Sequence, residues 1–276
     1  MFNSDFWKLF QSFLGFLKKL LAAHWRSLLG VLIGVYIPLQ GFGVLAAKVW
    51  KNQEGFPWDV PILLAIHERS QPQLDVFATV FTKLGVFWGV FPVATAIGLV
   101  LLRQRQWRSL AFLIVTLLGS AAINRTAKAV FHRVRPHLWE TLPPKLDFAF
   151  PSGHAMSSMS LVATLVILSW GTRWRLPTLI FGSLFVGVIA WTRLYLGVHF
   201  PSDILAGWMI AIAWVVGVSL VIRPNLIQPR PVNAETSLIR EENQPNQPYN
   251  SGGNLNCRAD SFSQSQSPPG VKTPVS

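Results

Sequence analysis

Apolar runs long enough to cross a lipid bilayer recur along this chain, and they limit its possible folds more than any other feature. Polar connections separate six such runs, at residues 27–47, 76–102, 109–126, 154–170, 176–192 and 204–222. A helix needs about 20 apolar residues to span the hydrocarbon core. Charged residues make up only 13% of the chain, whereas about a quarter is usual in soluble domains. We therefore predict an all-α, polytopic membrane protein built as a bundle of six transmembrane helices.

Two segments flank the predicted spans. Residues 1–26 repeat apolar side chains at steps of three and four, with lysines between them, which indicates an amphipathic helix in the membrane interface. The alternative is that they form the leading end of the first span. Residues 223–276 are rich in Pro, Ser, Asn, Gln and Gly, which favours a disordered cytoplasmic tail. The predicted domains are thus an interfacial helix (1–26), a six-span domain (27–222) and a tail (223–276).

The distribution of charge predicts the topology. The net charge is +12, but the cations lie at the ends of apolar runs, which favours lipid headgroups over nucleic acid as the partner. Arginines cluster at residues 103–108, 173–175 and 223–230. By the positive-inside rule these connections and both termini are cytoplasmic, in the plasma (inner) membrane. The single cysteine, Cys257, allows neither an internal disulfide nor a cysteine-based metal site.

Two connections on the outer side differ in character. Residues 48–76 contain prolines and charges of both signs and are expected to be a polar connection. The connection from Lys128 to Pro151 is strongly basic although it lies outside, which an anionic ligand would explain. Within it, His132, Arg133 and His137 are interpreted as charges that face lipid headgroups.

Three short motifs bring fixed cations, histidines and a carboxylate into this apolar chain. They are Lys128-Ala-Val-Phe-His-Arg-Val-Arg135-Pro136, Pro151-Ser-Gly-His154 and Arg193-Leu-Tyr-Leu-Gly-Val-His199-Phe-Pro-Ser-Asp203. The first two share one connection. Residues 155–192 separate the second from the third, which is enough chain for two spans and a tight turn. All three motifs should therefore converge at the outer end of the bundle.

The residue types in these motifs suit a phosphate. Lys128, Arg135 and Arg193 are cations that could surround it, and the arginine fork matches phosphate oxygens. Ser152 and Gly153 open a predicted helix, where free backbone N–H groups point at an anion.

The two histidines suit catalysis. A helical turn would let Asp203 accept from one ring nitrogen of His199 and leave the other nitrogen free to attack. His154 would then serve in acid–base catalysis. These residue types alone do not decide which histidine is the nucleophile.

The three motifs, in this order and spacing, resemble the type 2 phosphatidic acid phosphatase superfamily. One departure is Thr192, where that family usually has Ser before the arginine. The resemblance implies a phosphatase that needs neither metal nor cofactor. It implies that His199 attacks phosphorus and forms a phosphohistidine, that His154 protonates the leaving oxygen and that Asp203 orients His199. The residues implied to hold the phosphoryl oxygens are Lys128, Arg135, Ser152, Gly153 and Arg193.

The resemblance also implies a lipid phosphate as substrate, such as phosphatidate, phosphatidylglycerol phosphate or polyprenyl diphosphate. Two alternatives stay open: a phosphotransferase that uses the same intermediate, and a non-catalytic lipid-phosphate binder or transporter. The presence of both histidines argues against the last, because a binder needs only the cations. Nothing in the motifs indicates an oligomeric state.

Overall fold

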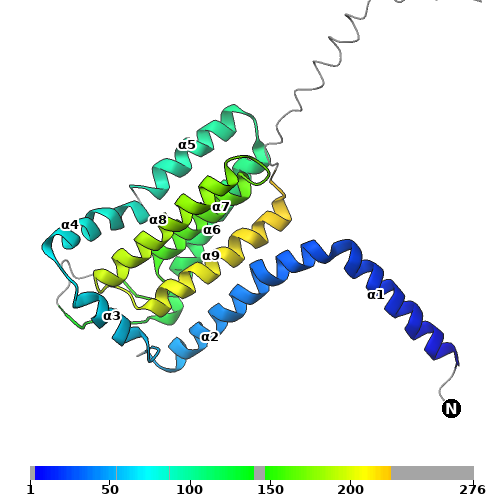
Figure 1. Ribbon diagram of the computed structural model, residues 1–276, viewed down its shortest axis with the longest axis horizontal. Coiled ribbons are helices and arrows are strands. Elements are labelled where there is room, and N and C mark those ends of the chain that lie inside the picture. The colour runs from blue at the N-terminus through cyan, green and yellow to red at the C-terminus, as the bar shows by residue number, and fades with distance from the viewer. Residues whose placement is uncertain (1–3, 54, 87, 140–146, 225–276) are drawn as a thin grey trace, which may run out of the picture. The chain divides into compact units, whose positions relative to one another are not determined.

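Helices form every regular element in the part of the chain that the computed structural model describes, residues 4–53, 55–86, 88–139 and 147–224 (Figure 1). Five helical runs have the length and apolarity to cross a membrane, namely Leu28–Lys51, Pro72–Arg103, Trp107–Phe131, Arg175–Tyr195 and Pro201–Ile222. The shorter apolar helix Gly153–Leu168 is the sixth. The prediction of an all-α polytopic membrane fold is confirmed.

The chain begins with one long helical stretch. It consists of α1 (Ser4–Val31), the π-helical turn η1 (Leu32–Tyr36) and α2 (Ile37–Lys51). Helix α2 packs along α9 (Pro201–Ile222), and glycine permits the close approach, since a Cβ on Gly41 would lie 2.7 Å from Sδ of Met209. The interfacial location of residues 1–26 stays a prediction, and the predicted tail lies outside the described residues from residue 225 onward.

Helix α7 (Gly153–Leu168) is the central helix of the bundle. It packs against α6 (Trp107–Phe131), α8 (Arg175–Tyr195) and α9, as Figure 1 shows. Small polar residues join it to α6: Ser160 Oγ donates to Ser120 Oγ at 2.8 Å, and Thr164 Oγ1 donates to Thr116 Oγ1 at 3.1 Å. Such residues let helices approach closely and hydrogen-bond where lipid surrounds the bundle. Packing on three sides therefore gives the helix that opens with the second motif a rigid position.

The predicted second span, residues 76–102, lies within the helical run Pro72–Arg103 that can cross a membrane, but it is not one continuous helix. The structure divides this region into α4 (Pro72–Phe81), the 3₁₀ turn η2 (Thr82–Gly85) and α5 (Val90–Arg103). A Cβ on Gly89 would lie 2.2 Å from the carbonyl oxygen of Leu84, so the tight turn between η2 and α5 requires glycine. Ser157 of α7 holds the same turn, because its Oγ donates to the Gly85 carbonyl at 2.5 Å.

The connection predicted over residues 48–76 also contains a helix. Helix α3 (Asp59–His67) lies within it, and Pro61 is tolerated because it falls in the first turn. Leu63 of this helix is fully buried, and α3 packs against both α8 and α9. This helix brings Asp59 to the third motif, which sequence spacing did not predict.

Candidate active site

The three motifs converge at one end of the bundle, around a cavity of about 310 Å³. Each lies where a helix begins or ends: Lys128 in the last turn of α6, Gly153 at the start of α7 and Arg193 in the last turn of α8. Six of the eight predicted site residues line the cavity, namely Lys128, Arg135, Gly153, His154, Arg193 and His199. The other two, Ser152 and Asp203, are fully buried.

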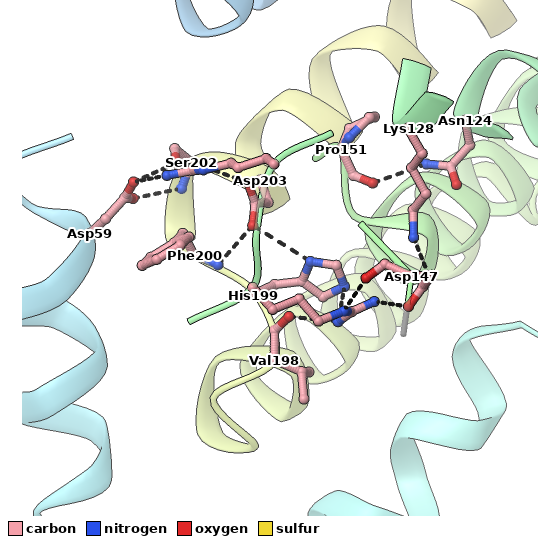
Figure 2. A network of polar contacts seen from close by, with 12 residues as sticks. Asp59, Asn124, Lys128, Asp147, Pro151, Val198, His199, Phe200, Ser202 and Asp203 are labelled. Atoms are coloured by element: carbon pink, nitrogen blue, oxygen red, sulfur yellow. Dashed lines mark hydrogen bonds and ion pairs between the residues drawn. The ribbon is translucent and has the colours of Figure 1, made fainter. Parts of the chain in front are cut away.

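His199 lies between the carboxylate of Asp203, to which Figure 2 draws its contact, and the guanidinium of Arg135. Its Nδ1 is 3.5 Å from Oδ2 of Asp203, and its Nε2 is 3.3 Å from Nη1 of Arg135. Because a guanidinium can only donate, Nε2 must carry the lone pair and Nδ1 the proton. Burial first, and then the charges of Arg193, Arg135 and Lys128, lower the pKa of His199 well below its usual 6.5. The ring is thus neutral, with the lone pair on Nε2.

The start of α9 fixes the carboxylate beside His199. Asp203 lies in the first turn of that helix, and its Oδ2 accepts from the backbone N–H of Phe200 at 2.9 Å. His199 itself precedes the helix, which begins at Pro201. The two side chains that were predicted to pair thus lie within ion-pair distance, at 3.5 Å, but Nδ1 of His199 forms no hydrogen bond with a described residue, and the helical turn that was expected around His199 is not present.

Arg193 is a buried cation with spare hydrogen-bonding capacity. Its side chain is 1% exposed, and Nη1 donates to Thr82 Oγ1 in η2 at 2.8 Å. Its Nε and the Oγ of Ser152 are buried without a hydrogen-bond partner among the described residues. Buried polar atoms rarely lack partners, so an oxyanion that reaches Arg193 would satisfy an otherwise costly donor.

The break in the second span lies against His154. A Cβ on Gly85 would lie 3.1 Å from Cδ2 of His154 and 2.8 Å from Cγ2 of Ile189. Asn124 of α6 supports the turn that leads into α7, since its Nδ2 donates to the Pro151 carbonyl at 3.1 Å. Two neighbouring elements thus hold the histidine and the Pro-Ser-Gly turn in place.

A buried ion cluster around Arg133 supports the site. The prediction that Arg133 faces lipid headgroups is therefore wrong. Arg133 is fully buried and donates to Asp203 Oδ1 at 2.5 Å, Asp59 Oδ2 at 3.0 Å and Ser202 Oγ at 2.8 Å. Asp59 in turn accepts from the backbone N–H of Ser202 at 2.9 Å. The connection is not helical from residue 132 to 137, so Arg133 and Arg135 can serve opposite sides, the ion cluster and the cavity.

Two acids of this region escaped the sequence analysis. Asp59 could have been noticed as a lone carboxylate in an otherwise apolar segment. Asp147 lies in the cavity wall and forms ion pairs with Lys128 and Arg135. Burial opposes its ionisation, but the hydrogen bond from Lys128 and the charges of Arg135 and Lys128 outweigh burial and lower the pKa of Asp147 to about 2. No motif marks it, because only the fold brings it to these cations.

The residues that the structure describes around the cavity form no arrangement typical of a metal centre. Among the residues that the structure describes, no three His, Cys, Asp or Glu side chains come together in a way that could hold a metal ion. The positive charge around the cavity comes from Lys128, Arg135 and Arg193.

Comparison with known proteins places this geometry in a family. The family model described as the PAP2 superfamily matches residues 109–227. The chain is 26% identical over 193 residues to an undecaprenyl-diphosphatase of Sulfolobus acidocaldarius, covering 68% of this chain and 84% of that protein. It is 30% identical over 167 residues to a lipid A 4'-phosphatase of Bacteroides thetaiotaomicron, covering 55% and 71%.

A solved structure agrees in fold. The crystal structure of a transmembrane PAP2-type phosphatidylglycerolphosphate phosphatase from Bacillus subtilis superposes with a TM-score of 0.60 at 25% identity, over 70% of this chain and all of that one. Sequence motifs, helical fold and cavity thus lead to one assignment: the chain belongs to the PAP2 superfamily.

Proposed function

We propose that this membrane lipid phosphatase cleaves its substrate in two steps, through a phosphohistidine on His199. The observation that carries the proposal is the position of the His199 ring, whose Nε2 lies at the cavity beside Arg135 while Nδ1 faces Asp203. A nucleophile needs a free lone pair and a partner that orients it. His199 has both.

The first step transfers the phosphoryl group to the protein. Nε2 of His199 attacks phosphorus, the bond from phosphorus to the lipid oxygen breaks, and that oxygen takes a proton from His154. The proton on Nδ1 stays in place, and the Asp203 carboxylate balances the positive charge that develops on the ring. In the second step a water molecule gives a proton to His154 and attacks phosphorus. The P–N bond then breaks, inorganic phosphate leaves and His199 is neutral again.

The cations stabilise the charge on the phosphoryl group in both steps. Lys128, Arg135 and Arg193 line the cavity, and preorganised positive groups in a water-poor site are the strongest catalytic contribution available for phosphoryl transfer. Gly153 lies at the start of α7, where the first backbone N–H groups have no partner within the helix. Ser152 adds its Oγ, which has no hydrogen-bond partner among the described residues, whereas its backbone N–H already donates to the Asp203 carbonyl. These five residues are proposed to bind the phosphoryl oxygens.

The cavity also suits an apolar group next to the phosphate. Its apolar wall includes Val86, Leu117, Ala121 and Met156. Relatives are named for undecaprenyl diphosphate, phosphatidylglycerophosphate and lipid A. We therefore propose a lipid monophosphate or diphosphate as substrate. Water is the proposed acceptor, and transfer to another acceptor would use the same intermediate.

The proposed orientation places the site on the extracytoplasmic side. The arginines of the α5–α6 connection, the α7–α8 connection and the end of α9 lie at the helix ends opposite to the motifs, and the positive-inside rule favours the cytoplasm for them. Both termini would then be cytoplasmic, in the plasma (inner) membrane. The span domain 27–222 would carry the whole site, with residues 1–26 in the interface and the tail in the cytoplasm.

Release of inorganic phosphate tests the function. Protein purified in detergent is given phosphatidate, phosphatidylglycerol phosphate and polyprenyl diphosphate, each with and without EDTA. Release from at least one lipid, unaffected by EDTA, is expected. Release that depends on added magnesium would overturn the proposed mechanism, and no release from any lipid would overturn the function.

Substrates with different leaving groups distinguish the roles of the two histidines. His199→Ala should lose turnover of every substrate, because no phosphohistidine can form. His154→Ala should lose about 10²–10⁴-fold on a lipid phosphate and far less in the first step with p-nitrophenyl phosphate, whose leaving group needs no proton. A burst of p-nitrophenol followed by stalled turnover is expected for His154→Ala, and a burst in His199→Ala would reverse the two roles.

A further inference from the structure

Asp147 occupies the hydrogen-bond donors of Lys128 and Arg135 that a phosphate would need. Its Oδ2 contacts Nζ of Lys128, and its Oδ1 accepts from Nη2 of Arg135 at 2.5 Å. Its backbone carbonyl accepts from Nε of the same arginine at 2.8 Å. Nε and Nη2 form the outer fork of the guanidinium, so Asp147 alone fills the edge of Arg135 that best matches an oxyanion. Figure 2 shows the Asp147 carboxylate in contact with Lys128.

The other bonds of Arg135 leave it no second fork to offer. Nη1 donates to the carbonyl of Val198 at 2.6 Å and lies 3.3 Å from Nε2 of His199. Those contacts hold the arginine against the nucleophile. A phosphoryl group can therefore bind Arg135 in a bidentate manner only where Asp147 now binds, and two anions cannot share those donors.

Asp147 is able to leave, unlike the acids of the buried ion cluster. Its side chain is 56% exposed, whereas those of Asp59 and Asp203 are fully buried. The low pKa of Asp147, about 2, keeps it anionic at any physiological pH. It is therefore a permanent charge at the mouth of the cavity, bound to the cations by contacts that water can replace.

We propose that Asp147 is a built-in competitor for the phosphoryl group, which any phosphate must displace from Lys128 and Arg135 before it can bind. The inference rests on the proposed function, because it concerns the same cations. When phosphate can bind only to molecules in which Asp147 has moved away, its apparent Kd equals the intrinsic Kd divided by the fraction of such molecules. Free phosphate, including the product, can displace Asp147 only through its charge, whereas a lipid phosphate also gains binding free energy from contacts with the apolar wall. Asp147 thus protects the site from inhibition by free phosphate.

A purely structural role for Asp147 predicts the opposite change in phosphate affinity. If Asp147 served only to hold Lys128 and Arg135 in position, its removal would weaken phosphate binding. Asp147→Asn keeps the size of the side chain and removes its charge. Glu68→Gln is the matched control, because Glu68 is exposed, follows α3 directly and forms none of the ion pairs found among the described residues.

The experiment titrates inorganic phosphate into detergent-purified protein by isothermal calorimetry and, separately, measures its inhibition of lipid phosphate turnover. In Asp147→Asn the Kd and the inhibition constant for phosphate should fall about 3- to 30-fold, the range for releasing two partly exposed ion pairs. The KM for the lipid phosphate should fall as well, and Glu68→Gln should match the wild type. An unchanged or higher Kd in Asp147→Asn would overturn the proposal.

Calorimetry separates this outcome from failure of the proposed function. A wild-type protein that releases no phosphate from any lipid would refute the function, yet the phosphate titration would still show whether Asp147 competes. Asp147→Ala repeats the titration without an amide that could hydrogen-bond to Arg135, and the same tightening is expected.

Discussion

Replacing Arg133 by Met should lower mainly the stability of the protein, whereas the same replacement at Arg135 should lower mainly its activity. Arg133→Met removes a fully buried guanidinium and leaves the carboxylates of Asp59 and Asp203 buried without their cation. Breaking a buried ion pair in this way costs about 3–5 kcal/mol, because an uncompensated charge remains inside the protein. Arg135→Met removes a cation whose partner, Asp147, is 56% exposed, and such pairs contribute about 1 kcal/mol or less.

The assay measures stability and activity on the same preparations. Unfolding is followed by circular dichroism as SDS is titrated into mixed micelles, and phosphate release is measured on a lipid phosphate. Arg133→Met should be less stable than the wild type by about 3–5 kcal/mol. Arg135→Met should unfold close to the wild type but lose most of its activity, because it removes a phosphate-binding cation.

A second substitution tests the cause of the destabilisation. Adding Asp59→Asn to Arg133→Met neutralises one of the two abandoned carboxylates, so the double variant should regain part of the lost stability, a coupling that only residues in contact show. The reasoning fails if Arg133→Met lies within about 1 kcal/mol of the wild type, or if Arg135→Met is the less stable of the two.

Three further outcomes follow from the site. Because the pKa of His199 lies well below 6.5 in the folded protein, the unfolded chain binds a proton that the native protein does not as the pH falls below 6.5. Stability measured by SDS titration should therefore decrease in that range, and His199→Gln should show a shallower decrease; an equal slope would contradict the assignment. Activity on the best lipid phosphate should survive prolonged dialysis against EDTA, and a loss restored by a divalent cation would show that the cations of the protein do not suffice. In a Cys257→Ser background, Leu138→Cys should react with an impermeant thiol reagent in intact cells while Gln104→Cys should not, and the reverse labelling would place the site in the cytoplasm.

Much of the fold and site was predictable from the sequence because the bilayer is such a restrictive solvent. Apolar length predicts the spans, and a helix satisfies its own backbone hydrogen bonds wherever it lies. Chain length then brings the motifs together: residues 155–192 can only leave one membrane face and return to it. His154 and His199 therefore had to meet at one end of the bundle, which the structure shows.

Tertiary structure alone decided which charges serve the cavity and which serve the core. Arg133 and Arg135 look alike in the sequence, and local spacing cannot say that one meets Asp59 from a helix 74 residues earlier. The same holds for Asp147, which forms an ion pair with Lys128 although 19 residues separate the two in the sequence. The helix break within the second span belongs here too, since Gly85 at the end of η2 lies against His154 and Ile189, which come from other helices. Long-range ion pairs and close backbone contacts depend on how helices pack, and hydrophobic length and local motif carry no information about that.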